Sequence, residues 1–287
     1  MHLCQFDDHR LGLVENGLVR DVTVVLDELP SRRYPFPMGD AFIAGLPMLR
    51  ERILAAASLA AAIPVPSVRL LSPVANPSKI IGAPVNYQRH LAEVVADPNI
   101  HHQNKAHIQA IHQSGLFLKA TSSVVGASQG VVIRHVERRT DHEVELAVII
   151  GKRATSVARE QALSFVAGYC IGLDITVRGP EERSFRKSID TYTVLGPWLV
   201  TPDELPYPSA LGLSITVNGE SRQKANTRDL ILGIPELIEF ASSFYTLLPG
   251  DVLLTGTPEG VGPIVPGDVM HARIDGIGEM VVQVREA

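Results

Sequence analysis

The sequence predicts a mixed fold that is rich in β-strands and contains a few α-helices. Two observations carry this prediction. Short alternating apolar runs meet at Asn16-Gly17 and again at Asn218-Gly219, and Asn-Gly between such runs signals a hairpin because both residues tolerate a positive φ. Helical spacing, by contrast, extends over only a few segments. With 287 residues, the chain is long enough to bury a sizeable core.

The first 73 residues are expected to form a small α+β domain. Alternating apolar residues over 10–14 and 18–25 predict strands. Residues 40–62 predict a helix because they are rich in Ala and Leu and poor in helix breakers. Four prolines then interrupt the chain before Lys79: Pro64, Pro66, Pro73 and Pro77. We place a domain boundary in this segment and assign residues 74–287 to a second, larger domain.

Composition and charge indicate a small-molecule ligand. The chain is 45% hydrophobic and 20% charged, and its net charge of −5 provides no electrostatic attraction for nucleic acid or an anionic membrane. Its two cysteines, Cys4 and Cys170, are too few for a disulfide framework or a thiolate zinc site. The polar N-terminus differs from a signal peptide, and no apolar run reaches membrane length. A cytoplasmic location is therefore expected.

Two carboxylates spaced by two residues, Glu143 and Glu145, form the centre of the candidate site. Because a strand alternates its side chains, both acids would point to one side while Val144 and Leu146 point to the core. Like charges this close share a proton or hold a hard cation, and Asp174 in another β-branched run is a candidate third ligand. The alternative is that Glu143 and Glu145 are solvated acids on an exposed sheet face.

His90 and Glu93 form a second candidate pair. If a helix begins after Tyr87, they lie three residues apart on one face, where the carboxylate can orient the imidazole as a general base. An exposed His beside an exposed Glu is the alternative. The polar segment 97–114 is expected to form a mobile lid over the site. It contains four histidines: His101, His102, His107 and His112.

Further side chains are candidates for contacts with a substrate. Lys119 ends a predicted strand and can neutralise a carboxylate, while Arg178 and Lys187 can bind an acid or stabilise an enolate. Solvated positions are the alternative for all three. Thr257 lies in the glycine-rich loop 256–262 and can present a hydroxyl and a backbone N–H to an anion. The prolines and strand-like residues that follow argue against a dinucleotide-binding motif.

Two more helices are predicted in the larger domain. Ser156 is a candidate N-cap for a helix that continues through Ala167, because apolar residues there keep helical spacing. A second helix is expected to start at Pro235. Its buried stripe is predicted to contain Leu237, Ile238, Phe240, Ala241 and Phe244. Strands are predicted over 251–255 and 269–274.

A series of motifs over residues 79–284 resembles the fumarylacetoacetate hydrolase family. The motifs are Asn86-Tyr87-x-x-His90 with Glu93, Phe117-x-Lys119, Asp141-x-Glu143-x-Glu145-Leu146, Gly168-Tyr169 through Asp174, Lys187 with Asp190-Thr191, Leu195-Gly196-Pro197-Trp198, Asn218-Gly219, Pro249-Gly250-Asp251 and Thr255-Gly256-Thr257-Pro258-x-Gly260-Val261-Gly262. Any one motif is weak evidence, whereas the series in this order is highly specific. The resemblance is to the acylpyruvase and 2-hydroxyhepta-2,4-diene-1,7-dioate isomerase-like branch.

The resemblance implies a mixed β-sandwich-like roll for the catalytic domain, a small N-terminal domain, and a homodimer. It implies three ligands for Mg²⁺ or Mn²⁺, with Ca²⁺ possible in a crystal: Glu143, Glu145 and Asp174. The implied catalytic residues are His90, Glu93 and Lys187. The implied substrate-binding residues are Arg178, Thr257 and Lys119. One departure is Glu181, where members of the family commonly carry Gln.

The implied reaction is hydrolysis of a carbon–carbon bond in an acylpyruvate, or a related β-diketo or 2-oxo acid, through a metal-bound enolate. Three carboxylates fill half of an octahedron and leave positions for a chelating substrate and water. His90 can deprotonate water for attack on the distal carbonyl. The histidines of the lid suggest a distinct substrate, an intermediate of aromatic compound catabolism.

Three other functions are compatible with the same residues. Two are an enol–keto isomerase and a decarboxylase of a 2-oxo dicarboxylate, of the hydroxyheptadienedioate isomerase or oxaloacetate decarboxylase type, since both reactions also pass through an enolate. The third is a non-catalytic relative that binds a metabolite. The intact acid triad and His–Glu pair argue against this third function.

Overall fold

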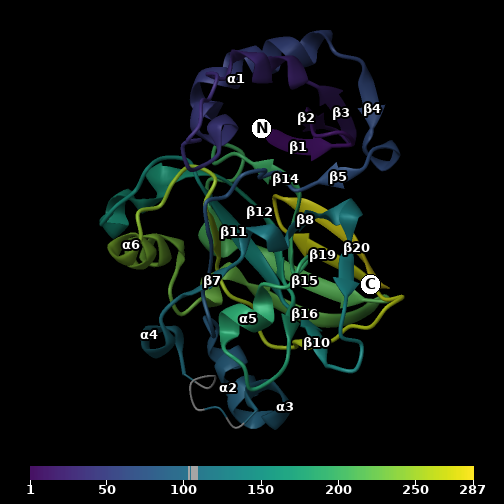
Figure 1. Cartoon of the computed structure of the whole chain (residues 1–287), viewed down its shortest axis with the longest axis vertical. Coiled ribbons are helices and arrows are strands. Elements are labelled where there is room, and N and C mark those ends of the chain that lie inside the picture. Colours follow the sequence, from purple (N-terminus) through teal and green to yellow (C-terminus); the bar gives the residue numbers. More distant parts are fainter. Residues whose placement is uncertain (103, 105–108) are drawn as a thin grey trace.

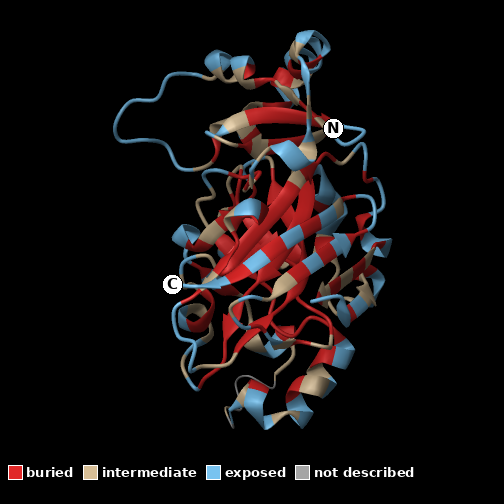
Figure 2. Cartoon of the chain, turned by 90° about the vertical axis from the view of Figure 1, so that its right-hand side faces the viewer, coloured by how far each residue is buried: buried red, intermediate tan, exposed pale blue. Residues whose placement is uncertain are grey.

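The computed structural model describes residues 1–102, 104 and 109–287. An N-terminal module lies at one end of the molecule, and the helices α2 (Gln88–Ala96) and α3 (Pro98–His101) lie at the other (Figure 1). Buried residues follow the strands between them (Figure 2). This is the mixed arrangement of strands with a few helices that the sequence predicts. No helix in the described part of the chain is long and apolar enough to span a membrane.

The N-terminal module consists of short strands covered by one long helix. Its elements are β1 (His2–Phe6), β2 (Arg10–Glu15), β3 (Leu18–Asp21), η1 (Thr23–Glu28), α1 (Ala41–Leu59), β4 (Ala62–Pro64), η2 (Val65–Ser67) and β5 (Leu70–Leu71). The predicted hairpin at Asn16-Gly17 joins β2 to β3. Asp40 caps α1, since its carboxylate accepts a hydrogen bond from the backbone N–H of Ile43. The strand predicted over 10–14 and the helix are therefore confirmed, although α1 ends at Leu59. The strand predicted over 18–25 ends at Asp21, and the 3₁₀ segment η1 follows it.

One large sheet runs through both parts of the chain. Among the described residues it contains twelve strands in the order β4-β3-β2-β1-β14-β12-β11-β17-β6-β7, with β5 beside β1 and β8 beside β14. Its further members are β6 (Ile80–Gly82), β7 (Phe117–Lys119), β8 (Val124–Gly126), β11 (Val144–Ile150), β12 (Val166–Asp174), β14 (Thr193–Val200) and β17 (Val252–Leu254). Because β1 pairs with β14, the sheet continues across the proposed boundary. The division into residues 1–73 and 74–287 stays a prediction.

A second sheet packs on the large sheet. It has the order β16-β15-β19-β20-β9, and a small third sheet has the order β13-β10-β18. These strands are β9 (Val131–Ile133), β10 (Thr140–His142), β13 (Thr176–Val177), β15 (Gly212–Val217), β16 (Glu220–Asn226), β18 (Gly262–Pro263), β19 (Val269–Ile274) and β20 (Gly278–Glu286). Val148 and Ile171 of the large sheet share one apolar cluster with Ile215 and Met270 of the second. Their contact forms the sandwich-like core of the larger part.

The remaining elements are short. They are α4 (Ile111–Ser114), α5 (Arg183–Lys187), α6 (Ile234–Phe244), η4 (Thr121–Ser123), η5 (Ala127–Gln129), η6 (Arg159–Phe165), η7 (Pro208–Ala210) and η8 (Thr227–Asp229).

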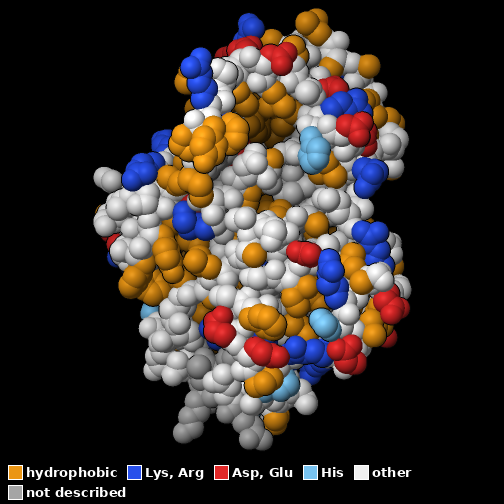
Figure 3. All heavy atoms as spheres, in the orientation of Figure 1, with side chains coloured by type: hydrophobic (Ala, Val, Ile, Leu, Met, Phe, Trp, Pro, Cys, Tyr) orange, Lys and Arg blue, Asp and Glu red, His pale blue; other side chains and the backbone are white. Residues whose placement is uncertain are grey.

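On the face drawn in Figure 3, acidic and basic side chains are interspersed rather than separated by sign. This distribution agrees with the small net charge of the sequence.

Two helix predictions need correction. The helix predicted from Ser156 through Ala167 is wrong, because only the 3₁₀ segment η6 forms and β12 begins at Val166. Val166 pairs with Ile150 of β11, so sheet pairing prevails over the local helical spacing. In α6 the predicted residues Leu237, Ile238 and Ala241 are buried. Phe244, however, is the last residue of the helix and is 71% exposed.

Candidate active site

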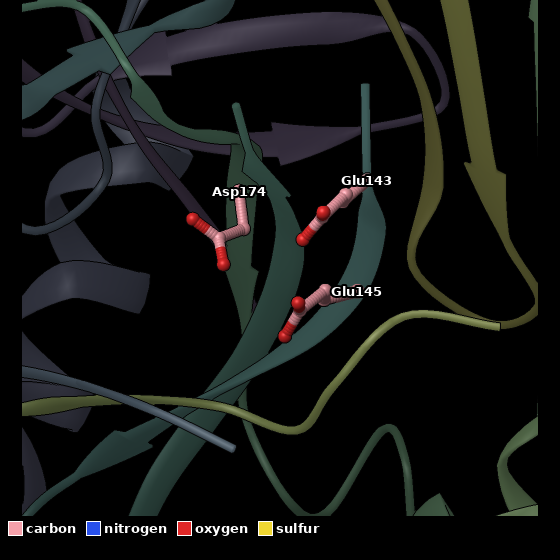
Figure 4. Close-up of side chains that lie close together, drawn as sticks. All are labelled: Glu143, Glu145 and Asp174. Atoms are coloured by element: carbon pink, nitrogen blue, oxygen red, sulfur yellow. The ribbon is translucent and has the colours of Figure 1, made fainter. Parts of the chain in front are cut away.

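Three carboxylates from neighbouring strands meet in the interior. Glu143 immediately precedes β11, Glu145 lies on β11, and Asp174 ends the adjacent antiparallel strand β12. The backbone N–H of Asp174 donates to the carbonyl oxygen of Glu143 at 2.9 Å, which sets the register of the two chains. Oxygens of all three side chains lie within 4.8 Å of one another. Figure 4 shows Glu143 and Glu145 extending towards Asp174.

The acids are not solvated. Glu143, Glu145 and Asp174 are 4%, 2% and 1% exposed, so the alternative of an exposed sheet face is wrong. Carboxylate oxygens are the ligands that Mg²⁺ and Mn²⁺ prefer, and three buried acids need a cationic partner. The donor set therefore fits a divalent cation, as the resemblance implies.

Two basic side chains beside the triad pair with its acids. Lys187, the last residue of α5, donates from Nζ to Glu143 Oε2 at 2.7 Å and to Asp174 Oδ2 at 2.6 Å. Arg178 donates from Nη2 to Glu143 Oε1 at 2.8 Å and from Nε to Asp141 Oδ2 at 2.7 Å. Both side chains are buried. The alternative of solvated positions is therefore wrong for Arg178 and Lys187.

Lys119 is a further basic side chain that pairs with the triad. Its ammonium pairs with Asp174 and donates to the carbonyl oxygen of Tyr192 at 2.7 Å. The side chain is buried and lies behind Asp174 rather than among the described residues that line the cavity. The contact between Lys119 and substrate stays a prediction. We infer in addition that Lys119 positions Asp174.

The pKa values of the two glutamates of the triad are shifted in opposite directions. Burial raises the pKa of Glu143, but the ion pairs with Lys187 and Arg178 outweigh burial and hold that pKa well below its ordinary value. Burial and the negative charge of Asp174 raise the pKa of Glu145 well above its ordinary value. Glu145 Oε2 accepts a hydrogen bond of 2.6 Å from the backbone N–H of Gly256. A divalent cation would allow Glu145 to ionise beside Asp174.

His90 and Glu93 form the predicted pair on α2, which starts at Gln88 as expected. His90 Nδ1 lies 2.8 Å from Glu93 Oε2, and the backbone N–H of Gly260 donates to Glu93 Oε1 at 2.9 Å. Because a carboxylate accepts hydrogen bonds, Nδ1 carries the proton and Nε2 is left as the basic nitrogen. His90 is 5% exposed. The alternative of an exposed imidazole is therefore wrong.

The glycine-rich loop closes the site on another side. Thr257 Oγ1 donates to the carbonyl oxygen of Val144 at 3.0 Å and accepts from Gln223 Nε2 at 2.8 Å. Gly256 has a φ of +98°, and a Cβ there would lie 2.7 Å from the Cβ of Asn86. Only glycine lets the loop approach this closely. Asn86 holds the loop by donating to the carbonyl oxygen of Thr255 at 2.8 Å.

One cavity brings the predicted groups together. The described residues that line it are Ala83, Pro84, Val85, His90, Val94, Ile100, Phe117, Glu143, Glu145, Asp174, Arg178, Arg183, Arg186, Lys187 and Thr257. Arg183 was not predicted as a site residue. Helix α5 places it at the cavity, and the sequence did not predict this helix. The spacing of four residues between Arg183 and Lys187 is the signal that identifies Arg183 once α5 is known.

Two other features of the sequence were Glu181 and the histidine-containing segment 97–114. Glu181, which replaces the common Gln, pairs with Arg138 at 2.9 Å, and this hydrogen bond lowers the pKa of the Glu181 carboxyl. In the segment 97–114, Ile100 lines the cavity whereas His102 and His112 are exposed. His107 lies outside the described residues. The role of this segment as a lid stays a prediction.

Known proteins share this sequence and fold. Residues 79–285 match the family model described as fumarylacetoacetate (FAA) hydrolase C-terminal. The chain is 59% identical over 285 residues to the maleylpyruvate hydrolase of Aquipseudomonas alcaligenes, covering 99% of each.

Two solved structures that cover the whole chain, and are themselves covered completely, extend this comparison. One is maleylpyruvate hydrolase from Sphingobium sp. SYK-6 in complex with manganese(II) ion and pyruvate, with 41% identity and a TM-score of 0.83. The other is 5-carboxymethyl-2-hydroxymuconate delta-isomerase from Mycobacterium smegmatis, with 29% identity and a TM-score of 0.71. The similarity is higher to the hydrolase than to the isomerase, which favours hydrolysis among the alternatives. The chain therefore belongs to the fumarylacetoacetate hydrolase family, as a divalent-metal-dependent hydrolase that cleaves a carbon–carbon bond of an acylpyruvate.

Proposed function

We propose that this enzyme hydrolyses maleylpyruvate to maleate and pyruvate, with Mn²⁺ or Mg²⁺ held by Glu143, Glu145 and Asp174. The observation that carries the proposal is the single cavity that holds both these acids and His90. The 59% identity to a maleylpyruvate hydrolase over nearly the whole chain supports the choice of substrate. So does the structural similarity to the enzyme bound to manganese and pyruvate.

Each group at the site has a separate role in the proposed reaction. When bound, the divalent cation supplies a Lewis acid that polarises the 2-oxo acid and stabilises negative charge on its oxygens. His90 Nε2 takes a proton from water, and the resulting hydroxide attacks the acyl carbonyl carbon. Cleavage of the carbon–carbon bond then releases maleate and the enolate of pyruvate, which takes up a proton. Glu93 keeps the proton of the imidazole on Nδ1 during the attack.

Lys187 and Arg178 stabilise negative charge in the reaction and transfer no proton. Their ion pairs with Glu143 and Asp174 place two positive groups at the edge of the cavity. Negative charge that develops on the leaving pyruvate is stabilised by such fixed groups, because they need no reorganisation during the reaction. Carbon is a poor leaving group, so this stabilisation accounts for much of the lowering of the barrier.

The test is an assay of the purified enzyme with Mn²⁺. We expect loss of the ultraviolet absorbance of maleylpyruvate together with release of one pyruvate per substrate, and loss of activity when EDTA is added. Acetylpyruvate and oxaloacetate serve as comparison substrates for hydrolysis and decarboxylation. Isomerisation of maleylpyruvate without pyruvate release, or turnover that persists in EDTA, would contradict the proposal.

Assembly and location are part of the same proposal. We infer a homodimer in the cytoplasm, as the family resemblance and the composition imply. Both cysteines are free and buried, which is compatible with a reducing compartment. Sedimentation of the purified protein at several concentrations tests the assembly, and a monomer at all of them would reject the dimer.

A further inference from the structure

Helix α5 presents three basic side chains to the catalytic cavity. Arg183, Arg186 and Lys187 all line it, and their spacings of three and four residues place them on one side of a helix. Lys187 forms ion pairs with Glu143 and Asp174 of the triad. The two arginines lie on the same wall, about one helical turn or less away along the axis.

Arg186 is buried, and backbone carbonyl oxygens orient it. Its Nε donates to the carbonyl oxygen of Glu181 at 2.9 Å, and its Nη1 donates to that of Val177 at 3.4 Å. These bonds fix the plane of the guanidinium beside the cavity. Burial, together with the nearby positive charges of Arg178 and Arg183, lowers the pKa of Arg186 to about 10. An anion in the cavity would relieve this crowding of like charges.

Arg183 is packed against an aromatic ring that connects it with the triad. Its guanidinium carbon lies 5.9 Å from the ring centroid of Phe117, and Lys187 Nζ lies 5.3 Å from the same centroid. Phe117 itself is buried and lines the cavity. The ring thus gives the wall between Lys187 and Arg183 an apolar surface suited to a planar hydrocarbon chain.

The charge of the cavity also favours a substrate with more than one carboxylate. Its described lining contains four arginine or lysine side chains and three carboxylates. A divalent cation at the triad makes this lining strongly positive. A chelating 2-oxo acid contributes one negative charge from its carboxylate, and a second carboxylate would place another negative charge in this positive lining.

We infer that Arg183 and Arg186 form a subsite for a second carboxylate, at the end of the acyl chain opposite the 2-oxo acid. This inference rests on the proposed function and extends it to a substrate class, the acylpyruvates with a short, carboxylate-terminated acyl chain. Arginine suits this role because its guanidinium binds a carboxylate through two parallel hydrogen bonds. Val85, Val94 and Ile100 line the cavity and provide an apolar surface for the carbons of the acyl chain.

The experiment compares a substrate that has the distal carboxylate with one that lacks it. Maleylpyruvate carries this carboxylate on a two-carbon vinyl chain, whereas acetylpyruvate has a methyl group in place of the whole carboxyvinyl chain. In Arg183→Met and Arg186→Met we expect kcat/KM for maleylpyruvate to fall by about 10- to 100-fold, as for the loss of a charge-assisted hydrogen bond. The loss should appear mainly in KM. The fall for acetylpyruvate should be several-fold smaller, so the preference of the enzyme for maleylpyruvate collapses.

Two control variants make the comparison decisive. Arg89→Met removes an arginine of α2 whose side chain is 85% exposed and lies outside the described lining of the cavity, and it should leave both substrates unaffected. Arg183→Lys retains the charge and should restore part of the preference. If the Met variants do not fold, inhibition of the unmodified enzyme decides: a dicarboxylate analogue of the substrate should inhibit at least about 10-fold more strongly than its monocarboxylate counterpart.

The outcomes separate this inference from the proposed function. Equal losses for the two substrates in folded variants, or equal inhibition by the two analogues, would overturn the subsite while leaving the hydrolase in place. If the unmodified enzyme hydrolysed neither substrate, the proposed function would be rejected, and the subsite with it.

Discussion

The acid triad and His90 line the same cavity but are held in different ways. Glu143, Glu145 and Asp174 lie on or directly beside paired strands in the interior. Glu143 and Asp174 form ion pairs with buried basic side chains, and Glu145 accepts a hydrogen bond from the backbone N–H of Gly256. His90 and Glu93 lie on the nine-residue helix α2, where the Glu93 side chain is 24% exposed. The metal site is thus built into the sheet, whereas the base is carried by a peripheral helix. Separate losses of metal binding and proton transfer are therefore expected.

The largest effect should come from the triad. Replacing Glu143 and Glu145 together by Ala removes two of the three acids, so we expect loss of Mn²⁺ binding and a fall in kcat of more than about 1000-fold, the scale of losing Lewis-acid assistance. Calorimetry with Mn²⁺ and the pyruvate assay measure the two losses. Glu160→Ala, at a side chain that is 75% exposed, is the control. Turnover close to that of the unmodified enzyme would remove the metal site from the mechanism.

A smaller effect is expected at the base. His90→Ala should lower kcat by about 100- to 10,000-fold through loss of general-base catalysis, while Mn²⁺ affinity stays unchanged because the triad is intact. The matched control is His271→Ala, since His271 forms an exposed pair with Glu279 at 3.0 Å. A parallel loss of metal affinity in His90→Ala would show that the two groups are not separable.

Lys119→Met tests whether a cation outside the cavity supports the triad. The variant leaves the buried Asp174 without one of its ion pairs, a change that costs on the order of 3–5 kcal/mol when a charge loses its partner. We expect a large fall in thermal stability in EDTA and a smaller one with Mn²⁺, together with about 10- to 100-fold weaker Mn²⁺ binding. Thermal unfolding and titration provide these measurements. Unchanged stability in EDTA would show that Lys119 does not hold Asp174.

The smallest effect concerns pH. Because the folded-state pKa of Glu145 is raised above its ordinary value of 4.5, its contribution to stability is complete below pH 4.5. That contribution decreases as the pH rises towards the folded-state pKa, and the free energy of unfolding falls by about 1.4 kcal/mol for each pH unit in this range. Without metal, the enzyme should therefore lose stability as the pH rises above 4.5 towards the raised pKa of Glu145.

The variant Glu145→Gln carries no titrating group and should show a flatter dependence over this interval. Denaturant unfolding in EDTA at several pH values measures both proteins. The lowered pKa of Glu143 has the opposite sign, but its effect falls at acidic pH, below this interval. Identical pH profiles for Glu145→Gln and the unmodified enzyme would contradict the assignment.

Sequence reasoning succeeded where local spacing decides the geometry. The alternation along β11 explains why Glu143 and Glu145 could be paired, and the spacing of three residues on α2 explains His90 with Glu93. Contacts between distant segments leave no local pattern. The ion pair of Lys119 with Asp174 is an example, because it depends on where β7, paired with β6, lies relative to β12.

The same limit explains the other differences. The spacing after Ser156 is helical, but partners on β11 draw Val166 into a strand. Phe244 has an apolar side chain at a helical position, yet it lies at the helix end, where no neighbour covers it fully. The place of Arg183 depends on α5, whose five residues are too few for a periodic signal.

The glycine-rich loop has a consequence for how the enzyme can change over evolution. Gly256 donates its N–H to Glu145, and Gly260, four residues later, donates its N–H to Glu93. The main chain from Gly256 to Gly260 thus fixes the distance between the cation-binding acids and the His90–Glu93 pair. Side chains elsewhere in the cavity can be exchanged for other substrates while this separation is preserved, since no side chain of the loop makes either bond.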